Sequence, residues 1–380
     1  MAEGGYKKMP CPVPTKTPMQ GSEMQYNLSL DRNKYKVACR FLLQKAVQQL
    51  IFSRFPDLRN SNFCKCSTVQ LGDFVAIKRN PETQRAYYHG VVTCASPLLC
   101  PVCSPRIMGY RSGEIMHGVH EWLSRSEENT CYLLTFTLQH SLADSLVDLL
   151  SLFADARQIF WRNGSVRRLL SLAGSVGRIT STEIQFSSEN GWHPHQHALL
   201  FCRKSAFDVE FLRSVWVSAL ESVGLSGIGR VAFDLTEARS AAQYLTKLSH
   251  EVALGALKEG RGHGHYSIVQ MMQEVFIGEA WAFDRFAELF DSMRGLHCLT
   301  WSRGLKKSLG ISDVSDSDIT LNSADASQLI DYLTMTKKVF SAFSPAQKGI
   351  LLDAVAADCR DEVVKLFVSV GAGGFVDDRV

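Results

Sequence analysis

Apolar residues recur at helical spacing in several parts of the chain, whereas other segments have the composition of strands. Residues 35–55 predict an amphipathic helix. Its predicted apolar face consists of Val37, Phe41, Leu42, Ala46, Leu50 and Ile51. Further helices are predicted over residues 109–125, 144–172, 206–224 and 235–252. Strands are predicted at residues 131–137, 178–186, 195–202 and 229–234, and at the strand-like segments FVAIKR and AYYHGVVTC.

Two of these strands form a predicted hairpin, because the turn sequence SENG at residues 188–191 separates residues 178–186 from 195–202. Residues 1–30 are rich in Pro, Gly, Lys and Ser and show no apolar periodicity, so we expect a mobile tail there. The pattern as a whole predicts an α+β protein with a central antiparallel sheet.

The composition is that of a globular protein. Among the 380 residues, 46% are hydrophobic and 21% charged, which excludes a disordered or fibrous chain. No apolar run is long enough for a membrane span, and the N-terminal residues lack the apolar core of a secretion signal. We therefore expect a cytoplasmic protein without a membrane partner.

The charge is unevenly distributed along the chain. Residues 1–311 contain 35 basic and 27 acidic residues, a net +8, whereas residues 312–380 contain six basic and eleven acidic residues, a net −5. A basic excess favours a nucleic-acid partner, although ordinary solubilising charge is the alternative.

The sequence His193-Pro194-His195-Gln196-His197 is the strongest local signal for chemistry. Residues two apart on a strand face the same side, so His195 and His197 can ligate one metal ion. The flanking ALLF segment makes both faces of this strand apolar, as in a central buried strand. The alternative is a histidine cluster that only makes hydrogen bonds.

A third ligand follows from the register of the hairpin. If the hairpin folds about Glu189, Glu183 lies opposite His195. Two imidazoles and one carboxylate, with positions left for water or phosphate, suit Mg²⁺ or Mn²⁺. The alternative for Glu183 is an ion pair with Arg178 or His193.

The segment SAAQYLTKLSHE at residues 240–251 places Tyr244 and Lys247 on one face of a predicted helix. A phenol and an ammonium group can then face one phosphate, and a nearby cation would favour the phenolate as a nucleophile. The alternative is that Tyr244 packs in the core and Lys247 pairs with Glu251.

Cysteines cluster between residues 64 and 103. The spacing Cys94-x5-Cys100-x2-Cys103, preceded by Cys64-x-Cys66, favours a tetrahedral zinc that closes a loop-rich module. One or both of Cys64 and Cys66 would complete the site. A redox pair at Cys100 and Cys103 is the alternative, but the prolines and additional cysteines favour zinc.

Several basic and acidic residues have a less specific pattern. Candidate DNA contacts are Arg106, Arg111, Arg167 and Arg168, although such arginines also occur on solvated faces. Asp234 and Glu237 have the spacing of a helix-capping box, so we expect Glu237 to begin the helix over residues 235–252.

Five segments in this order resemble the bacterial plasmid rolling-circle replication initiators (Rep) of the HUH endonuclease class. They are TCASPLLCPVCSPRI, LLTFTLQH, ENGWHPHQHALLF, AAQYLTKL and LTWSRGLKKSLGI, and they span about residues 60–315. The resemblance implies a ferredoxin-like or RNA-recognition-like nuclease in which His195 and His197 bind the metal. It also implies that Tyr244 attacks DNA, leaving a 5′-phosphotyrosyl link and a free 3′-hydroxyl that primes replication.

The resemblance also implies partners: single-stranded and double-stranded plasmid origin DNA, and a host helicase and polymerase. Two departures stand out. Gln196 replaces a hydrophobic residue between the histidines, and Ser240 stands where some plasmid initiators have a glutamate for the closing cleavage. A transposase or relaxase of the same class, a metal-dependent amidohydrolase and a non-catalytic zinc protein that binds nucleic acid are the alternatives.

These observations divide the chain into five predicted parts. After the tail come a helix with the zinc module (31–125) and the nicking domain (126–252). A family-associated helical segment (253–320) and an acidic helical C-terminal region (321–380) follow.

Overall fold

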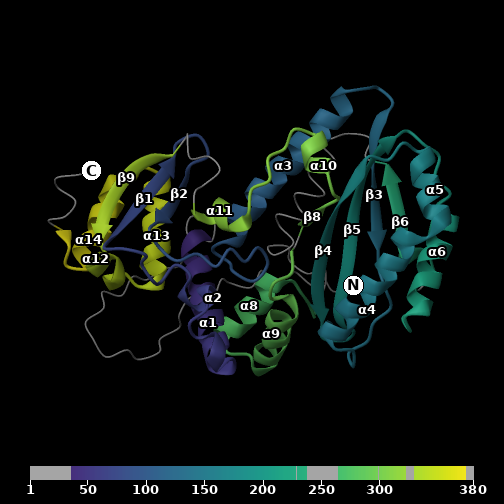
Figure 1. Ribbon diagram of the computed structural model, residues 1–380. Coiled ribbons are helices and arrows are strands. Elements are labelled where there is room, and N and C mark those ends of the chain that lie inside the picture. Colours follow the sequence, from purple (N-terminus) through teal and green to yellow (C-terminus); the bar gives the residue numbers. More distant parts are fainter. Residues whose placement is uncertain (1–35, 228, 238–263, 298, 322–328, 374–380) are drawn as a thin grey trace, which may run out of the picture.

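The computed structural model describes residues 36–227, 229–237, 264–297, 299–321 and 329–373. Two antiparallel sheets, each covered by helices, confirm the predicted α+β class (Figure 1). None of the helices in these ranges is long and apolar enough to cross a membrane. The predicted tail, Ser240, Tyr244 and Lys247 lie outside the described residues.

The larger sheet has six strands in the order β6-β3-β5-β4-β7, and β8 also pairs with β4. Its strands are β3 (Asn129–Phe136), β4 (Gly177–Ser187), β5 (Gly191–Arg203), β6 (Phe233–Glu237), β7 (His265–Tyr266) and β8 (Leu299–Trp301). The predicted hairpin is β4 and β5, so the histidine-bearing strand lies in the middle of the sheet. Alternating side chains of such a strand are buried on both faces, which explains its continuous apolar run.

Three helices cover one face of this sheet: α4 (Leu146–Arg162), α5 (Gly164–Leu172) and α6 (Val209–Ser222). The fully buried Phe136 ring lies at the centre of this core, 5.0 Å from both the Phe160 and the Trp216 rings and 5.2 Å from the Phe233 ring. The edge-to-face arrangement of these rings stabilises this face of the six-stranded sheet.

A long helix, α3 (Ser104–Ser124), covers part of the other face, next to the short helix α10 (Leu305–Ser308). Val119 and Trp122 of α3 pack with Leu199 and Phe201 of β5. His195 and His197 precede Leu199 on the same strand at two-residue spacing, so they lie on the α3 side of the sheet.

The second sheet has the order β2-β1-β9 and a separate core. Its elements are β1 (Phe74–Asn80), β2 (Arg85–His89), β9 (Ile330–Thr336), α12 (Lys337–Ala342), α13 (Pro345–Ala356) and α14 (Arg360–Ser369). The C-terminal region predicted to be helical thus contains the helices α12, α13 and α14 but also a strand that the sequence analysis did not predict. Strand β9 buries Leu333 and Met335 at two-residue spacing and supplies the second neighbour of β1.

Helix α1 (Lys36–Arg54) connects the two cores. Ala38 packs in the second core, so close to α13 that a Cβ on Gly349 would lie 2.3 Å from the Ala38 Cα, whereas Val47 and Ile51 pack in the first. The predicted apolar face was partly wrong, because Gln44 and Gln48 are buried while Leu42 and Leu50 are partly exposed. The remaining elements are η1 (Pro56–Leu58), α2 (Asn62–Lys65), η2 (Gly229–Val231), α8 (Ile268–Ile277), α9 (Ala280–Met293) and α11 (Asp316–Leu321).

The segment that ends at Glu237 also differs from expectation. Residues 229–234 form η2 and only the start of β6, and Glu237 ends β6 rather than beginning a helix. Pairing of Phe233 with Phe136 buries both rings and holds residues 233–237 at the sheet edge. This tertiary contact outweighs the local capping pattern.

Candidate metal centres

The β4–β5 hairpin brings Glu183, His195 and His197 together. Its register is the predicted one, since Glu183 lies directly opposite His195. Gly191 at the turn has a φ of 75°, and a Cβ there would lie 2.5 Å from the Ser141 carbonyl oxygen, so the tight turn depends on glycine. A fixed turn and two-residue side-chain alternation together place all three side chains on one face.

The donor atoms of Glu183, His195 and His197 (the Glu183 group) lie close enough together to ligate one metal ion. The Glu183 Oε2 atom lies 2.8 Å from His195 Nε2 and 3.7 Å from His197 Nε2, and one ligand atom from each residue lies within 4.8 Å of the others. Two ligands about 2.1 Å from one ion and at right angles are about 3 Å apart, which these distances approximate. The Glu183 group is therefore compatible with metal binding.

Two further side chains orient these donors. Thr135 Oγ1 lies 3.2 Å from His197 Nδ1, which leaves Nε2 facing Glu183, and Gln185 Nε2 donates a 2.8 Å hydrogen bond to Glu183 Oε1. Such outer contacts fix the orientation of metal ligands. The sequence analysis missed both residues. Gln185 could have been found from its two-residue spacing to Glu183, but Thr135 lies on β3 and required the strand order.

Histidines continue along β5 beyond the Glu183 group. The His193 ring lies 5.3 Å from that of His195 and 4.7 Å from that of His140, whose Nδ1 is 2.7 Å from the Asn190 carbonyl oxygen. Burial, and then the neighbouring His195 and His140, lower the pKa of His193 to about 4. His193 is therefore neutral at pH 7 and adds no positive charge to this face.

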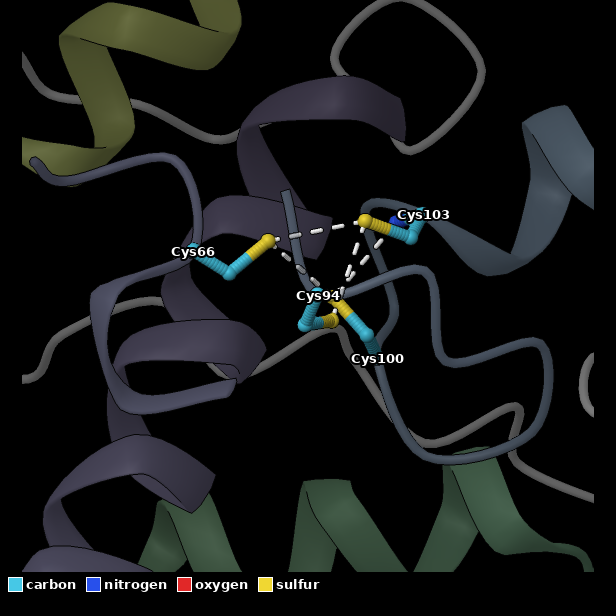
Figure 2. A group of neighbouring side chains, drawn as sticks. All are labelled: Cys66, Cys94, Cys100 and Cys103. Carbon is cyan, nitrogen blue, oxygen red and sulfur yellow. Dashed lines mark hydrogen bonds between the residues drawn. The ribbon is translucent and has the colours of Figure 1, made fainter. Parts of the chain in front are cut away.

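Four cysteine sulfurs form a second cluster, the Cys66 group, in which the side chains point toward one another (Figure 2). The Cys66 sulfur lies 3.5 Å from that of Cys103 and 3.8 Å from that of Cys100, and the Cys94 sulfur lies 3.8 Å from that of Cys103. Four sulfurs about 2.3 Å from a tetrahedral zinc would be about 3.8 Å apart. Of the two cysteines considered as the fourth ligand, Cys66 belongs to this group and Cys64 does not.

Electrostatics also favour a cation in the Cys66 group. Hydrogen bonds from Cys100, Cys103 and Cys94 lower the pKa of Cys66 well below its usual value, whereas burial raises that of Cys100 well above it. One thiolate is therefore stabilised by the neighbouring thiols, and further ionisation is opposed in this buried space. A divalent cation would remove that opposition, since its ligands are thiolates.

Helix α1 supports the Cys66 group with its two buried glutamines. Gln44 Nε2 donates to the Cys100 sulfur at 3.2 Å, and Gln48 Nε2 donates to the carbonyl oxygens of Phe63 at 2.9 Å and Cys66 at 3.0 Å. The sequence analysis missed these roles. Two glutamines four residues apart, adjoining the apolar face of a helix, are the signal that could have indicated them.

The candidate DNA contacts have different surroundings. Arg106 stacks over the Tyr87 ring at 4.5 Å, and Arg111 binds Glu114 at 2.7 Å and Asp316 at 2.6 Å. Arg167 and Arg168 are exposed on α5. A contact between any of these four arginines and DNA stays a prediction.

The chain is 26% identical to the protein named "Protein rep" from Streptomyces lividans, in an alignment that covers 72% of this chain and 76% of that protein. This chain resembles a bacterial Rep protein. The resemblance to Rep initiators inferred from the sequence motifs is thereby confirmed. The alignment extends beyond a single motif, so the similarity to Rep concerns most of the chain.

A second relative, "Neomycin resistance protein" from Streptomyces cyanogenus, is 33% identical over 135 residues. This match covers 29% of this chain and 30% of the relative. No family model matches the chain, and no solved structure matches it.

Proposed function

We propose that this chain initiates plasmid replication by cutting one strand of origin DNA with a tyrosine nucleophile. The observation that carries the proposal is the Glu183 group, which lies on adjacent central strands of a chain that resembles a Rep protein. Zinc would occupy the Cys66 group as a structural ion, and Mg²⁺ or Mn²⁺ the Glu183 group.

In this proposal, Glu183, His195 and His197 hold the catalytic ion, while Thr135 and Gln185 fix two of those ligands. A bound Mg²⁺ or Mn²⁺ would supply positive charge that polarises the scissile phosphate. The metal-binding residues thus also determine where the phosphate of a single DNA strand lies on the sheet.

Tyr244 is the proposed nucleophile and Lys247 its cationic neighbour. The phenol oxygen bonds to phosphorus as the bond from phosphorus to the 3′ oxygen breaks, and the phenol proton is balanced by protonation of that 3′ oxygen. The products are a 5′-phosphotyrosyl link and a free 3′-hydroxyl. A host polymerase would extend this end and a helicase would separate the strands. No residue is assigned to the closing cleavage, because position 240 is serine.

Cleavage of labelled single-stranded DNA from the replicon of this protein, with Mn²⁺ or Mg²⁺, tests the proposal. We expect a nick with protein covalently attached to the 5′ side, and loss of both in Tyr244→Phe, because phenylalanine has no nucleophilic oxygen. Full activity of Tyr244→Phe would refute the assignment of the nucleophile.

Chelation provides a second test, because thiolate ligands favour zinc whereas the Glu183 group accepts harder, exchangeable ions. Mild chelation should abolish nicking while about one zinc per chain is retained, and added Mn²⁺ should restore nicking. Nicking that survives removal of the exchangeable ion would exclude the proposed role of the Glu183 group.

A further inference from the structure

A cavity of about 840 Å³ lies where the cysteine-rich loop, the end of α9 and strand β8 meet. Its walls come from residues 94–99, 293–297, 299–304 and 313–317, among others. The last residues of α9 and the turn after β8 belong to parts of the chain for which the sequence analysis assigned no chemistry. A volume of this size is typical of sites that enclose small molecules or single nucleotides rather than a double helix.

Neighbouring strands of the six-stranded sheet connect the cavity to the Glu183 group. Leu299 of β8 pairs with Ser181 of β4, and Ser181 pairs in turn with His197 of β5. Two strand spacings correspond to about 10 Å between the backbones of Leu299 and His197. Leu299 packs with the α3 core, so it faces the same side of the sheet as the histidines.

The wall of the cavity contains more basic than acidic side chains: Arg111, Arg294, Arg303 and Lys306 against Asp313 and Asp316. Arg111 and Lys306 are engaged by carboxylates, at 2.7 Å and 3.1 Å from Glu114 respectively, and Lys306 also pairs at 3.1 Å with the exposed Asp313. Arg303 is exposed and forms no ion pair with any residue in the described ranges, and Arg294 forms only a 3.4 Å pair with the exposed Asp291. The wall therefore offers two guanidinium groups to an anion.

Apolar surface lies beside these cations. Leu296, a wall residue two positions after Arg294, is 48% exposed although its side chain is large and apolar. Trp301, a partly buried aromatic residue, also lines the cavity. Cations next to apolar and aromatic side chains are the combination that binds the phosphates and bases of a single nucleic-acid strand.

We propose that this cavity binds nucleotides of the single DNA strand that flank the phosphate at the Glu183 group. Arg303 and Arg294 contact the backbone phosphates, and Leu296 and Trp301 contact the bases. The inference rests on the proposed nicking function, and it adds a site that selects the strand next to the cut. Because β8 belongs to the same sheet as the metal ligands, a strand bound there is held at a fixed distance from the reacting phosphate.

Binding of a fluorescent single-stranded origin oligonucleotide, measured without added divalent ions in the Tyr244→Phe background, separates this site from cleavage. Arg303→Ala should weaken binding about tenfold or more, the loss expected for one charged hydrogen bond. The slope of log affinity against log salt should fall by about 0.7, as for one lost phosphate contact with a single strand. Leu296→Glu should weaken binding at least as much, because it places a carboxylate beside the phosphates.

The matched control is Arg360→Ala, which removes an exposed arginine at the start of α14 in the other sheet unit. It should bind as the parent protein does. Unchanged zinc content and far-UV circular dichroism verify that Arg303→Ala and Leu296→Glu are folded. If both variants are folded and bind normally, the cavity is not the strand site.

Crosslinking from a 5-iodouracil placed at successive positions of the oligonucleotide locates the strand. We expect crosslinks to the peptide containing residues 294–303 only from positions within a few nucleotides of the cut. Crosslinks only to other peptides would overturn the inference. Displacement of the oligonucleotide by free ATP would also overturn it, as would a loss of duplex binding in Arg303→Ala equal to the loss of single-strand binding. Normal nicking together with these negative results would refute the strand site but not the proposed function. An active Tyr244→Phe protein with the expected crosslinks would refute only the assignment of Tyr244 as the nucleophile.

Discussion

The Cys66 group and the Glu183 group are both candidate metal centres, but they are built in opposite ways. The Cys66 group draws its sulfurs from irregular segments and encloses the ion position with four similar donors. The Glu183 group draws three donors from one hairpin in the middle of a sheet. A closed set of thiolates suits an ion that maintains structure, whereas three donors on rigid strands leave positions open for a reacting group.

Substitution at the Cys66 group should therefore have the largest effect on the whole molecule. Cys100→Ser removes one of four thiolates and should release a zinc whose binding contributes on the order of 10 kcal/mol in small structural sites. Metal content and thermal unfolding measure the loss. Cys64→Ser is the matched control, since Cys64 lies outside the group and its loss should leave zinc in place.

Cys100→Ser should also weaken recognition of the duplex origin more than cleavage of a short single strand, because the six-stranded sheet contains none of these ligands. Protein that is isolated without zinc, yet folded and origin-specific, would show that the four cysteines are ordinary core residues.

Substitution at the Glu183 group should remove chemistry and spare the fold. His197→Ala should reduce cleavage by about a thousandfold or more, since a bound cation contributes several kcal/mol to such a reaction. DNA binding should remain, because affinity comes mainly from backbone phosphates. Gln196→Leu is the control on the neighbouring position, whose side chain faces the opposite side of β5 and should tolerate the change. Simultaneous loss of binding and folding in His197→Ala would instead indicate a structural histidine cluster.

Glu183→Ala tests whether the carboxylate belongs to the metal site. Loss of the anionic donor should raise the Mn²⁺ concentration needed for half-maximal cleavage by about a hundredfold, because affinity for hard cations depends on ligand charge. The measurement is a metal titration of nicking, with melting temperature as the check on folding. A titration curve that matches the parent protein would remove Glu183 from the site.

The smallest effect is expected for the outer contact to His197. Thr135→Val keeps the shape of the side chain and removes the hydroxyl 3.2 Å from His197 Nδ1, which should weaken metal affinity by about tenfold. Thr135→Ser restores the hydroxyl and should recover affinity. Equal metal titrations for the valine and serine variants would show that Thr135 does not position the ring.

The amino-acid sequence by itself determined the parts of the Glu183 group that depend on local geometry. A short turn at residues 188–191 fixes the register of the hairpin, and the two-residue period of a strand then fixes which side chains share a face. Glu183 could therefore be predicted opposite His195 without knowledge of any other strand. The same local rules predicted α6 and β3 to within a few residues, and the predicted helical region 144–172 contains α4 and α5.

Only the tertiary structure decided the contacts between segments far apart in the chain. The choice of Cys66 over Cys64, the pairing of β1 with β9 and the position of Thr135 beside His197 all depend on it. So does the rotation of α1 that buries Gln44 and Gln48. Local periodicity specifies which residues share a face, but burial of apolar surface and satisfaction of polar groups across the whole chain determine which faces meet.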